Sequence, residues 1–377
     1  MKIVQAKKTK GNPWEFSTDK SILKNPLVLV FGDRFLLEEE NCFEEISQLF
    51  PDGHIVIGST SGEILKENVF EKSMVLTAIE FEKSSYLVKS KNLADFNGDD
   101  ELLGKTLMEE FPQKNLKHVF VVSEGSSVNG SSLIIGLELS KKANVGLSGG
   151  LCGDDARFEK TLSSYNTAPK EGEIIAVGLY GESLEVTSAN YGGWSVFGPK
   201  RTITKSEENI LFELDGKPAL DLYKQYLGDK AKDLPYSALF YPLNVDQHDG
   251  SQPLVRTILN IDEASNSMIL AGNVPEGSSV QLMMSTVDDI ADGAREAAKL
   301  AVEIREKKTE LALLVSCVGR KLVMDQRTED EVEEVIDVIG KQAAVTGFYS
   351  YGEMAPFASQ GACKLHNQTM TLTLLSE

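Results

Sequence analysis

The chain has 377 residues, which is enough for two or three domains and a large buried core. Its 57 Asp and Glu against 38 Lys and Arg give a formal net charge of −19, which argues against binding to nucleic acid or to an anionic membrane face. Four dispersed cysteines form no Cys-x-x-Cys pair, and no apolar run approaches the roughly 20 residues that span a bilayer. We therefore expect a soluble cytoplasmic protein with reduced thiols, without a signal peptide or membrane insertion.

The first predicted unit consists of a strand, an acidic helix and a second strand. The first strand covers residues 26–35, and the helix covers 36–50, where apolar residues recur at three- and four-residue spacing. Asp33 is available as the N-terminal cap of this helix. The second strand, HIVIGSTSGEI (54–64), ends in a glycine turn, and the alternating residues 73–81 predict a further strand.

The same order returns twice, at residues 118–155 and 311–354, and the alternating stretches 173–181 and 369–375 follow these copies. In every copy the second strand runs into a turn that ends in an acid: Gly62-Glu63, Gly153-Asp154 and Gly352-Glu353. The pattern predicts an α/β protein in which repeated βαβ units with added antiparallel strands form mixed sheets.

Two helices carry signals for a capping box. In the third copy, Thr328 and Glu331 have the spacing of a capping box. Thr286 and Asp289 have it at the start of an alanine-rich helix over about 287–306, whose small residues would pack close to a sheet.

The sequence predicts two tightly associated halves. Residues 256–284 predict a hairpin that turns at 262–266, followed by another strand. The polar, helix-like stretch 215–235 is the segment where we expect the boundary between the two domains. We place the domains at 24–217 and 218–377.

The glycine turns carry no complete catalytic motif. The first turn has Thr60 where an esterase elbow needs serine, and the run around Ser148 matches the letters but lacks a good following helix. Neither turn continues into a phosphate-binding Gly-Lys-Ser/Thr. Cys317 and His366 could form a nucleophile and base, although a lone cysteine on an apolar strand is usually part of the core. We expect no enzyme, with a hydrolase or transferase using Cys317 or Ser148 as the alternative.

Four scattered histidines form no metal-ligand signature, so we expect no metal site. A single axial haem ligand stays open as an alternative.

Polar side chains gather at the carboxyl ends of strands in the first and third units, where α/β sheets hold ligands. Arg320 supplies a forked donor for a carboxylate, and Glu63 or Glu353 could meet an ammonium, which suits a small zwitterion such as an amino acid. Alternatively, Arg320 pairs with one of these acids as a structural ion pair. The candidate ligand-binding residues are Ser59, Thr60, Ser61, Glu63, Cys317, Arg320, Tyr349, Tyr351, Glu353, His366 and Asn367.

Six stretches in order resemble the FIST-domain family, a bacterial and archaeal sensory module with an N-terminal FIST part and a C-terminal FIST_C part. They are VIGSTSGEI (56–64), SGGLCGDDARFEKT (148–161), the segment 192–228, SCVGR (316–320), GFYSYGEMAP (347–356) and LHNQTMTLTLL (365–375). The resemblance implies a cytoplasmic domain that binds small molecules such as amino acids. Family members are often fused to histidine kinase, diguanylate cyclase or chemoreceptor modules, and some bind haem and respond to nitric oxide.

The resemblance ends at Glu377 without room for such an output module, so we expect a sensor that passes its signal to a separate histidine kinase, cyclase or chemoreceptor protein. The alternatives are a haem-binding nitric-oxide sensor, the hydrolase or transferase named above, and a scaffold whose acidic run 38–40 meets a basic protein.

Overall fold

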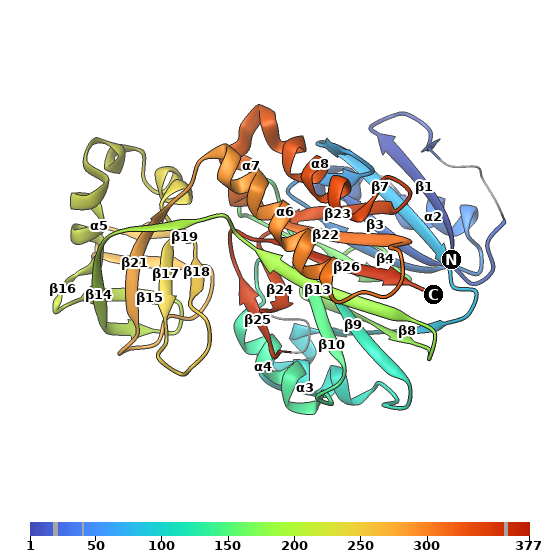
Figure 1. The fold of residues 1–377 in the computed structure, drawn as a ribbon, viewed down its shortest axis with the longest axis horizontal. Coiled ribbons are helices and arrows are strands. Elements are labelled where there is room, and N and C mark those ends of the chain that lie inside the picture. The colour runs from blue at the N-terminus through green and yellow to red at the C-terminus, as the bar shows by residue number, and fades with distance from the viewer. Residues whose placement is uncertain (18–21, 40, 358–360) are drawn as a thin grey trace.

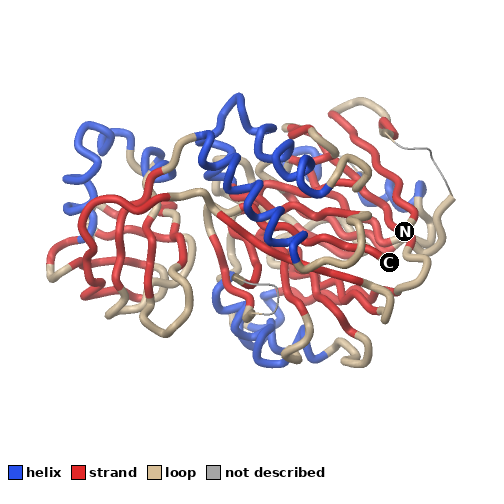
Figure 2. Tube along the Cα trace, in the orientation of Figure 1, coloured by secondary structure: helices blue, strands red, loops and turns tan. Residues whose placement is uncertain are grey.

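The computed structural model describes residues 1–17, 22–39, 41–357 and 361–377. Figure 1 shows a large domain, formed by residues 1–194 and 285–377, and a small domain, formed by residues 195–284, at one end of it. Three mixed sheets fill the large domain, and the helices lie on its outside (Figure 2). The mixed α/β class is therefore confirmed. Within the described residues, no helix is both long enough and apolar enough to cross a membrane.

The strand order of the first predicted unit is confirmed, but two helices, Arg34–Glu39 and Cys42–Leu49, stand where the sequence predicted one helix over 36–50. Two strands pair in parallel, a third pairs antiparallel with the first of them, and an N-terminal strand extends the sheet. Asp33 starts the first helix as predicted, because its Oδ1 accepts hydrogen bonds from the backbone N–H groups of Phe35 (3.0 Å) and Leu36 (3.3 Å). The elements are β1 (Lys2–Thr9), β2 (Glu15–Phe16), β3 (Leu27–Gly32), α1 (Arg34–Glu39), α2 (Cys42–Leu49), β4 (His54–Ser59) and β7 (Ser73–Glu80).

The second unit repeats this arrangement: β9 and β10 are parallel, and β12 and β8 continue antiparallel. Two helices cover the outer face of the sheet and cross closely at Gly136, where a Cβ would lie 2.0 Å from the carbonyl oxygen of Glu101. The elements are β8 (Ser85–Asn92), η1 (Leu93–Phe96), α3 (Asp100–Glu109), β9 (Leu116–Ser123), α4 (Gly130–Ser140), β10 (Gly146–Leu151) and β12 (Glu173–Tyr180).

The third unit is also confirmed: β22 and β23 are parallel, and β26 and β13 continue antiparallel. The capping box of Thr286 and Asp289 is present at the start of α6, whose buried alanines pack on the sheet as predicted. The elements are β13 (Glu185–Tyr191), α6 (Val287–Glu303), β22 (Leu311–Cys317), α7 (Val318–Met324), η4 (Asp325–Arg327), α8 (Thr328–Ile339), β23 (Ala344–Ser350) and β26 (Met370–Ser376).

The capping box predicted for Thr328 and Glu331 is wrong. Thr328 is the first residue of α8, and its hydroxyl donates to the carbonyl of Asp325 at 2.5 Å. Glu331 points into the protein and is fully buried. Glu331 pairs with Arg320 in the core, and this buried ion pair is stronger than a cap at the end of the helix.

The three units exchange short strands in a closed cycle. The short strand at the acidic turn of the first unit pairs with a strand of the third sheet. The short strand of the second unit pairs with a strand of the first sheet. The short strand of the third unit pairs with a strand of the second sheet. These strands are β5 (Glu63–Leu65), β11 (Ser163–Tyr165) and β24 (Gly352–Pro356), with β6 (Asn68–Phe70) and β25 (Cys363–His366) beyond two of them. Each sheet is therefore completed by another unit, and the three turns meet.

A shared apolar core lies between the three sheets. Phe31 of the first unit, Phe120 of the second and Phe348 of the third all belong to it, and the rings of Phe31 and Phe348 lie 4.6 Å apart. Separate apolar layers hold the helices on the outer face of each sheet. Because both faces of the parallel strands are buried, these strands read as nearly continuous apolar runs.

The small domain is one curled antiparallel sheet with a helix packed against it. The hairpin predicted to turn at 262–266 is present. The predicted domain boundary at 217/218 lies within this sheet, so strands from both sides of it pair with one another. The elements are β14 (Ser195–Glu207), β15 (Ile210–Leu214), β16 (Lys217–Pro218), α5 (Ala219–Leu227), η2 (Gly228–Asp233), η3 (Tyr236–Phe240), β17 (Leu243–Asp246), β18 (Leu254–Arg256), β19 (Ile258–Asp262), β20 (Ser267–Leu270) and β21 (Ser279–Met284).

Candidate functional site

Arg320 forms a structural ion pair, and its partner is neither of the acids that the sequence suggested. The side chain is fully buried, and Nε and Nη2 lie 2.8 Å and 2.7 Å from Oε2 of Glu331. The remaining donors contact three backbone carbonyls: Nη1 those of Gly192 and Gln368, and Nη2 that of Ile290. The expectation that this guanidinium offers a free fork to a ligand is therefore corrected.

Glu63 and Glu353 occupy equivalent places in the first and third units. Two hydroxyls donate to each: Thr60 (2.6 Å) and Ser73 (2.7 Å) to Glu63, and Ser350 (2.7 Å) and Thr369 (3.0 Å) to Glu353. Complete burial raises the pKa of each carboxyl group to about 8. Near neutral pH both groups therefore mostly hold a proton, which makes them weak partners for an ammonium ion.

The first and third units do meet at their strand ends, as the sequence predicted. The backbone N–H of Ser61 donates to the carbonyl of Tyr349, and the N–H of Tyr349 donates to that of Gly62, both at 2.8 Å. Ser59 donates to the carbonyl of Gly153, and the hydroxyl of Tyr349 donates to Glu331. The contacts of Ser59 and Ser61 and the N–H of Tyr349 join the units to one another, and the bond from Tyr349 to Glu331 lies within the third unit.

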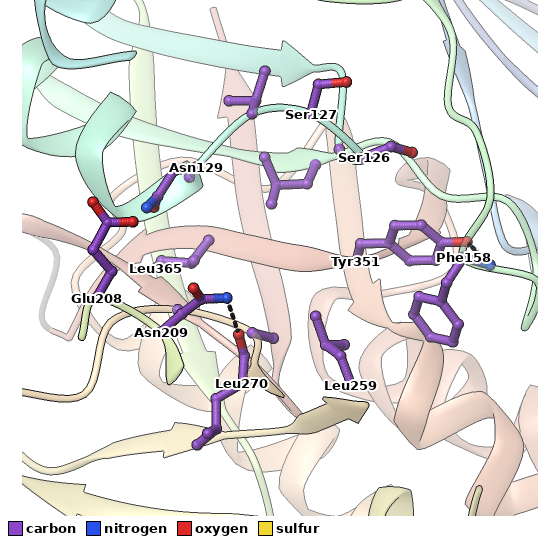
Figure 3. A pocket seen from close by; sticks show the side chains of 16 residues that line it. Ser126, Ser127, Asn129, Phe158, Glu208, Asn209, Leu259, Leu270, Tyr351 and Leu365 are labelled. Atoms are coloured by element: carbon purple, nitrogen blue, oxygen red, sulfur yellow. Dashed lines mark hydrogen bonds between the residues drawn. The ribbon is translucent and has the colours of Figure 1, made fainter. Parts of the chain in front are cut away.

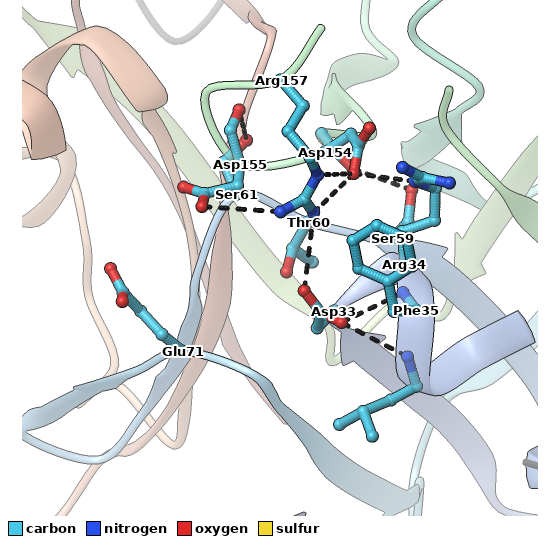
Figure 4. A network of polar contacts seen from close by, with 12 residues as sticks. Asp33, Arg34, Phe35, Ser59, Thr60, Ser61, Glu71, Asp154, Asp155 and Arg157 are labelled. Carbon is cyan, nitrogen blue, oxygen red and sulfur yellow. Dashed lines mark hydrogen bonds and ion pairs between the residues drawn. The ribbon is translucent and has the colours of Figure 1, made fainter. Parts of the chain in front are cut away.

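The turn of the second unit carries an ionic network that the sequence did not indicate (Figure 4). Asp154 is fully buried and accepts hydrogen bonds from Nε of Arg34 at 2.8 Å and from Nε of Arg157 at 2.9 Å. Lys321, in the middle of α7, donates to the carbonyl of Ser61, and its Nζ lies 3.4 Å from Oδ1 of Asp155. The network thus ties the turns of the first and second units to α7 of the third unit.

The candidate nucleophiles lie inside the protein. Ser148 is fully buried, with its Oγ 2.6 Å from His118 Nε2 and 2.6 Å from Thr373 Oγ1. Burial lowers the pKa of His118 to about 3 and raises that of the Cys317 thiol well above its usual range. Neither the hydroxyl nor the thiol has the exposure or the activated state that a nucleophile needs.

The other predicted groups are also engaged. His366 is buried, its Nε2 lies 3.0 Å from the carbonyl of Ala355, and burial lowers its pKa to about 4. In the acidic run, Glu38 pairs with Arg34 and Lys160, while Glu40 lies outside the described residues. Among the described residues, no group of three or more His, Cys, Asp or Glu could hold a metal ion.

A pocket of about 350 Å³ lies where the small domain meets the second and third units (Figure 3). Of the predicted ligand-binding residues, Tyr351 lines it. Its ring stacks on that of Phe158 at 4.5 Å, and its hydroxyl accepts a hydrogen bond from the Phe158 N–H. The remaining lining residues are Gly125, Ser126, Ser127, Val128, Asn129, Gly130, Leu151, Glu208, Asn209, Leu259, Leu270, Ala271, Gly272 and Leu365.

One wall of the pocket is the loop that precedes α4, and hydrogen bonds hold it firmly. The carboxylate of Glu124 accepts from the N–H groups of Ser126 (2.7 Å) and Ser127 (2.8 Å). Asn129 caps α4 by accepting from the N–H groups of Ser131 and Ser132. This fixed loop presents an ordered polar surface to the cavity.

Negative charge lies at one end of the pocket. Glu208, at the tip of the turn between β14 and β15, is exposed and has no ion-pair partner in the described part of the chain. Asp100 is half-buried behind Asn129, and burial raises its pKa to about 6. Phe158 and Tyr351 lie at the opposite end in Figure 3, so the lining is acidic at one end and aromatic at the other.

The loop between β25 and β26 joins the two domains. Asn367, a predicted ligand contact, accepts a hydrogen bond from the Thr257 N–H at 3.4 Å, and Gln368 donates to the carbonyl of Leu239 at 3.1 Å. Arg256 of the small domain donates to the carbonyl of Leu365 at 2.8 Å. The segment 365–368 (LHNQ) therefore connects the two domains beside the pocket.

Two family models match the chain in succession. The FIST N domain matches residues 26–217, and the FIST C domain matches residues 219–356. The uncharacterized protein MJ1623 of Methanocaldococcus jannaschii is 21% identical over 324 residues, which are 78% of this chain and 60% of that protein. The chain thus spans about 60% of that relative's length.

Proposed function

The chain belongs to the FIST family, a family of sensory domains of signal transduction, and on this premise we propose that it senses a small polar molecule in the pocket between its two domains. The observation that carries the proposal is the position of this pocket. Tyr351 and the loop before α4 line it from the large domain, and Glu208 and Leu259 line it from the small domain. Pockets at domain interfaces are preferred ligand sites, and a ligand that touches both sides favours one relative placement of the domains.

The lining suits a ligand with an amino group and an apolar body, of which an amino acid is an example. Glu208 supplies an unpaired carboxylate for an ammonium ion, and the stacked rings of Phe158 and Tyr351 supply an apolar face. A volume of about 350 Å³ suits a small molecule.

We propose that the signal passes to a separate output protein, such as a histidine kinase, a cyclase or a chemoreceptor. Contacts at the joint would carry the change, because Gln368 links Leu239 of the small domain to the loop that also contacts Arg320. A binding role without catalysis is supported by the burial of Ser148 and Cys317.

A thermal-shift screen over amino acids, amines and small carboxylates tests the proposal. A ligand at 100 times its Kd should stabilise the native protein by about 2.7 kcal/mol. A screen in which no compound raises the melting temperature would refute small-molecule sensing by this pocket.

A variant that fills the pocket locates the binding. Leu259→Trp should abolish the thermal shift of any hit, because the larger ring occupies the cavity. Leu300→Trp, at an exposed position on α6 outside the pocket lining, is the matched control and should leave the shift unchanged. Equal shifts in both variants would place the ligand elsewhere.

A further inference from the structure

Arg256, the last residue of β18, is a buried arginine without an acidic partner. Only 3% of its surface is exposed, and no carboxylate of the described residues lies within ion-pair distance of it. Its Nε donates to the carbonyl of Asn273 (3.3 Å), and its Nη1 donates to those of Leu365 (2.8 Å) and Val255 (3.4 Å). Nη2 has no hydrogen-bond partner within the described part of the chain.

Other buried arginines of the protein are neutralised. Arg320 pairs with Glu331, Arg34 pairs with Asp154, and Arg305 lies 3.5 Å from Glu185. Burial lowers the pKa of Arg256 to about 10, so the guanidinium still carries its charge at neutral pH. A buried charge without a counter-ion is costly to keep, which points to a partner that the chain itself does not supply.

The guanidinium of Arg256 lies directly behind the wall of the interdomain pocket. Gly272 lines the pocket, and a Cβ at this position would lie 3.0 Å from both Cζ and Nε of Arg256. Gly272 has a φ of +126°, a conformation that favours glycine. Leu365, whose carbonyl accepts from Arg256, lines the same pocket. Gly272 thus separates the positively charged guanidinium of Arg256 from the cavity.

We propose that the ligand of this pocket carries a carboxylate group and that Arg256 supplies its positive partner. The inference rests on the proposed function, since it assumes that the pocket binds a small molecule. A carboxylate accepts two parallel N–H bonds from a guanidinium, and Nη2 is available for one of them. With Glu208 at the acidic end, the pocket then offers one group of each sign to a zwitterion.

Binding would also alter the joint between the domains. Arg256 belongs to the small domain, and its hydrogen bond to Leu365 reaches the large domain. A carboxylate that draws the guanidinium toward the cavity competes with the Leu365 carbonyl for the same donors. Ligand occupancy is in this way coupled to an interdomain contact.

The test compares three probes on the full-length chain by calorimetry: the L-amino acid that gives the largest thermal shift, its primary amide and its decarboxylated amine. The wild-type protein should bind the acid at least tenfold more tightly than the amide or the amine, because each of these lacks the carboxylate. Equal affinities for the three probes, or a preference for the amine, would overturn the role of Arg256 while leaving small-molecule sensing intact. Absence of binding by every compound of the screen would overturn both proposals.

The variant Arg256→Gln separates ligand recognition from a structural role. It should lose the preference for the acid while binding the amine as the wild type does. Loss of affinity for acid and amine alike would show that Arg256 only holds the structure together. Arg305→Gln, at a buried arginine outside the pocket lining, is the matched control and should keep the preference. If Arg256→Gln does not fold, Arg256→Lys keeps the charge without the planar fork, and it should bind the acid more weakly with amine binding unchanged.

Discussion

The buried ion pair of Arg320 and Glu331 provides a direct test of how the third unit is held together. Glu331 accepts hydrogen bonds from Ser316 (2.8 Å), from Tyr349 (2.7 Å) and from Arg320, and neither member of the pair is exposed. The variant Glu331→Gln keeps the shape of the side chain. It removes the negative charge and turns an acceptor into an amide donor.

The expected loss of stability in Glu331→Gln depends on the contacts that Arg320 keeps in this variant. Arg320 stays charged and buried, held by the carbonyls of Gly192, Gln368 and Ile290 alone. Removing one partner of a buried pair costs about 3–5 kcal/mol, because the other charge is left uncompensated. We therefore expect Glu331→Gln to lower the free energy of unfolding by about 3–5 kcal/mol.

Urea unfolding followed by tryptophan fluorescence and circular dichroism measures this change. Trp194 is a local reporter, because its indole N–H donates to Gln368, whose carbonyl also accepts from Arg320. Asp330→Asn, which breaks the exposed pair with Arg327, is the control and should cost less than about 1 kcal/mol. A loss below about 1 kcal/mol for Glu331→Gln would refute the reasoning.

Three further predictions concern protonation, reactivity and packing. Because the pKa of Glu63 is raised to about 8 in the folded state and is ordinary in the unfolded state, the contribution of this group to stability should fall by about 1.4 kcal/mol per pH unit as pH rises from about 4.5 to 8; the difference in unfolding free energy between the wild type and Glu63→Gln should show this slope, and a difference that does not change with pH would contradict the assignment. Cys317, like the other three buried cysteines, should resist a thiol reagent such as dithiobis(nitrobenzoate) in the native protein and react only after urea is added; rapid native labelling that Cys317→Ala abolishes would show that this thiol is accessible. Gly136→Ala should destabilise the protein by about 1–3 kcal/mol in urea, because its Cβ would lie 2.0 Å from the carbonyl oxygen of Glu101; a neutral result would mean that α3 and α4 separate freely.

Local patterns predicted the units well, because the features that define a unit are local. The apolar run of β3, the cap at Asp33 and the capping box at Thr286 each depend on residues within a few positions of one another. The same local reasoning failed at Glu331, where the spacing of a cap coincided with a partner for Arg320. A buried charge pair is stronger than a terminal cap, and the sequence does not show which contact forms.

The candidate site was predictable only in part. Tyr351 lines the pocket, but the other predicted residues, including Glu63 and Glu353, lie outside that lining and are paired in the interior. The pocket takes its walls from the loop before α4, the β14–β15 turn and the segment around Gly272. These segments are far apart in the sequence, and none carries a motif that signals a site.

The sequence by itself determined the three repeated units, their parallel and antiparallel strands and the acidic turn that ends each second strand. Periodicity and turn chemistry act over a few residues, so they can be read directly. The tertiary structure alone decided the cyclic exchange of β5, β11 and β24, the small domain that spans the 217/218 boundary, and the placement of Arg256 behind the pocket wall. These features depend on contacts between residues up to hundreds of positions apart, which shape and charge select only once the chain has folded.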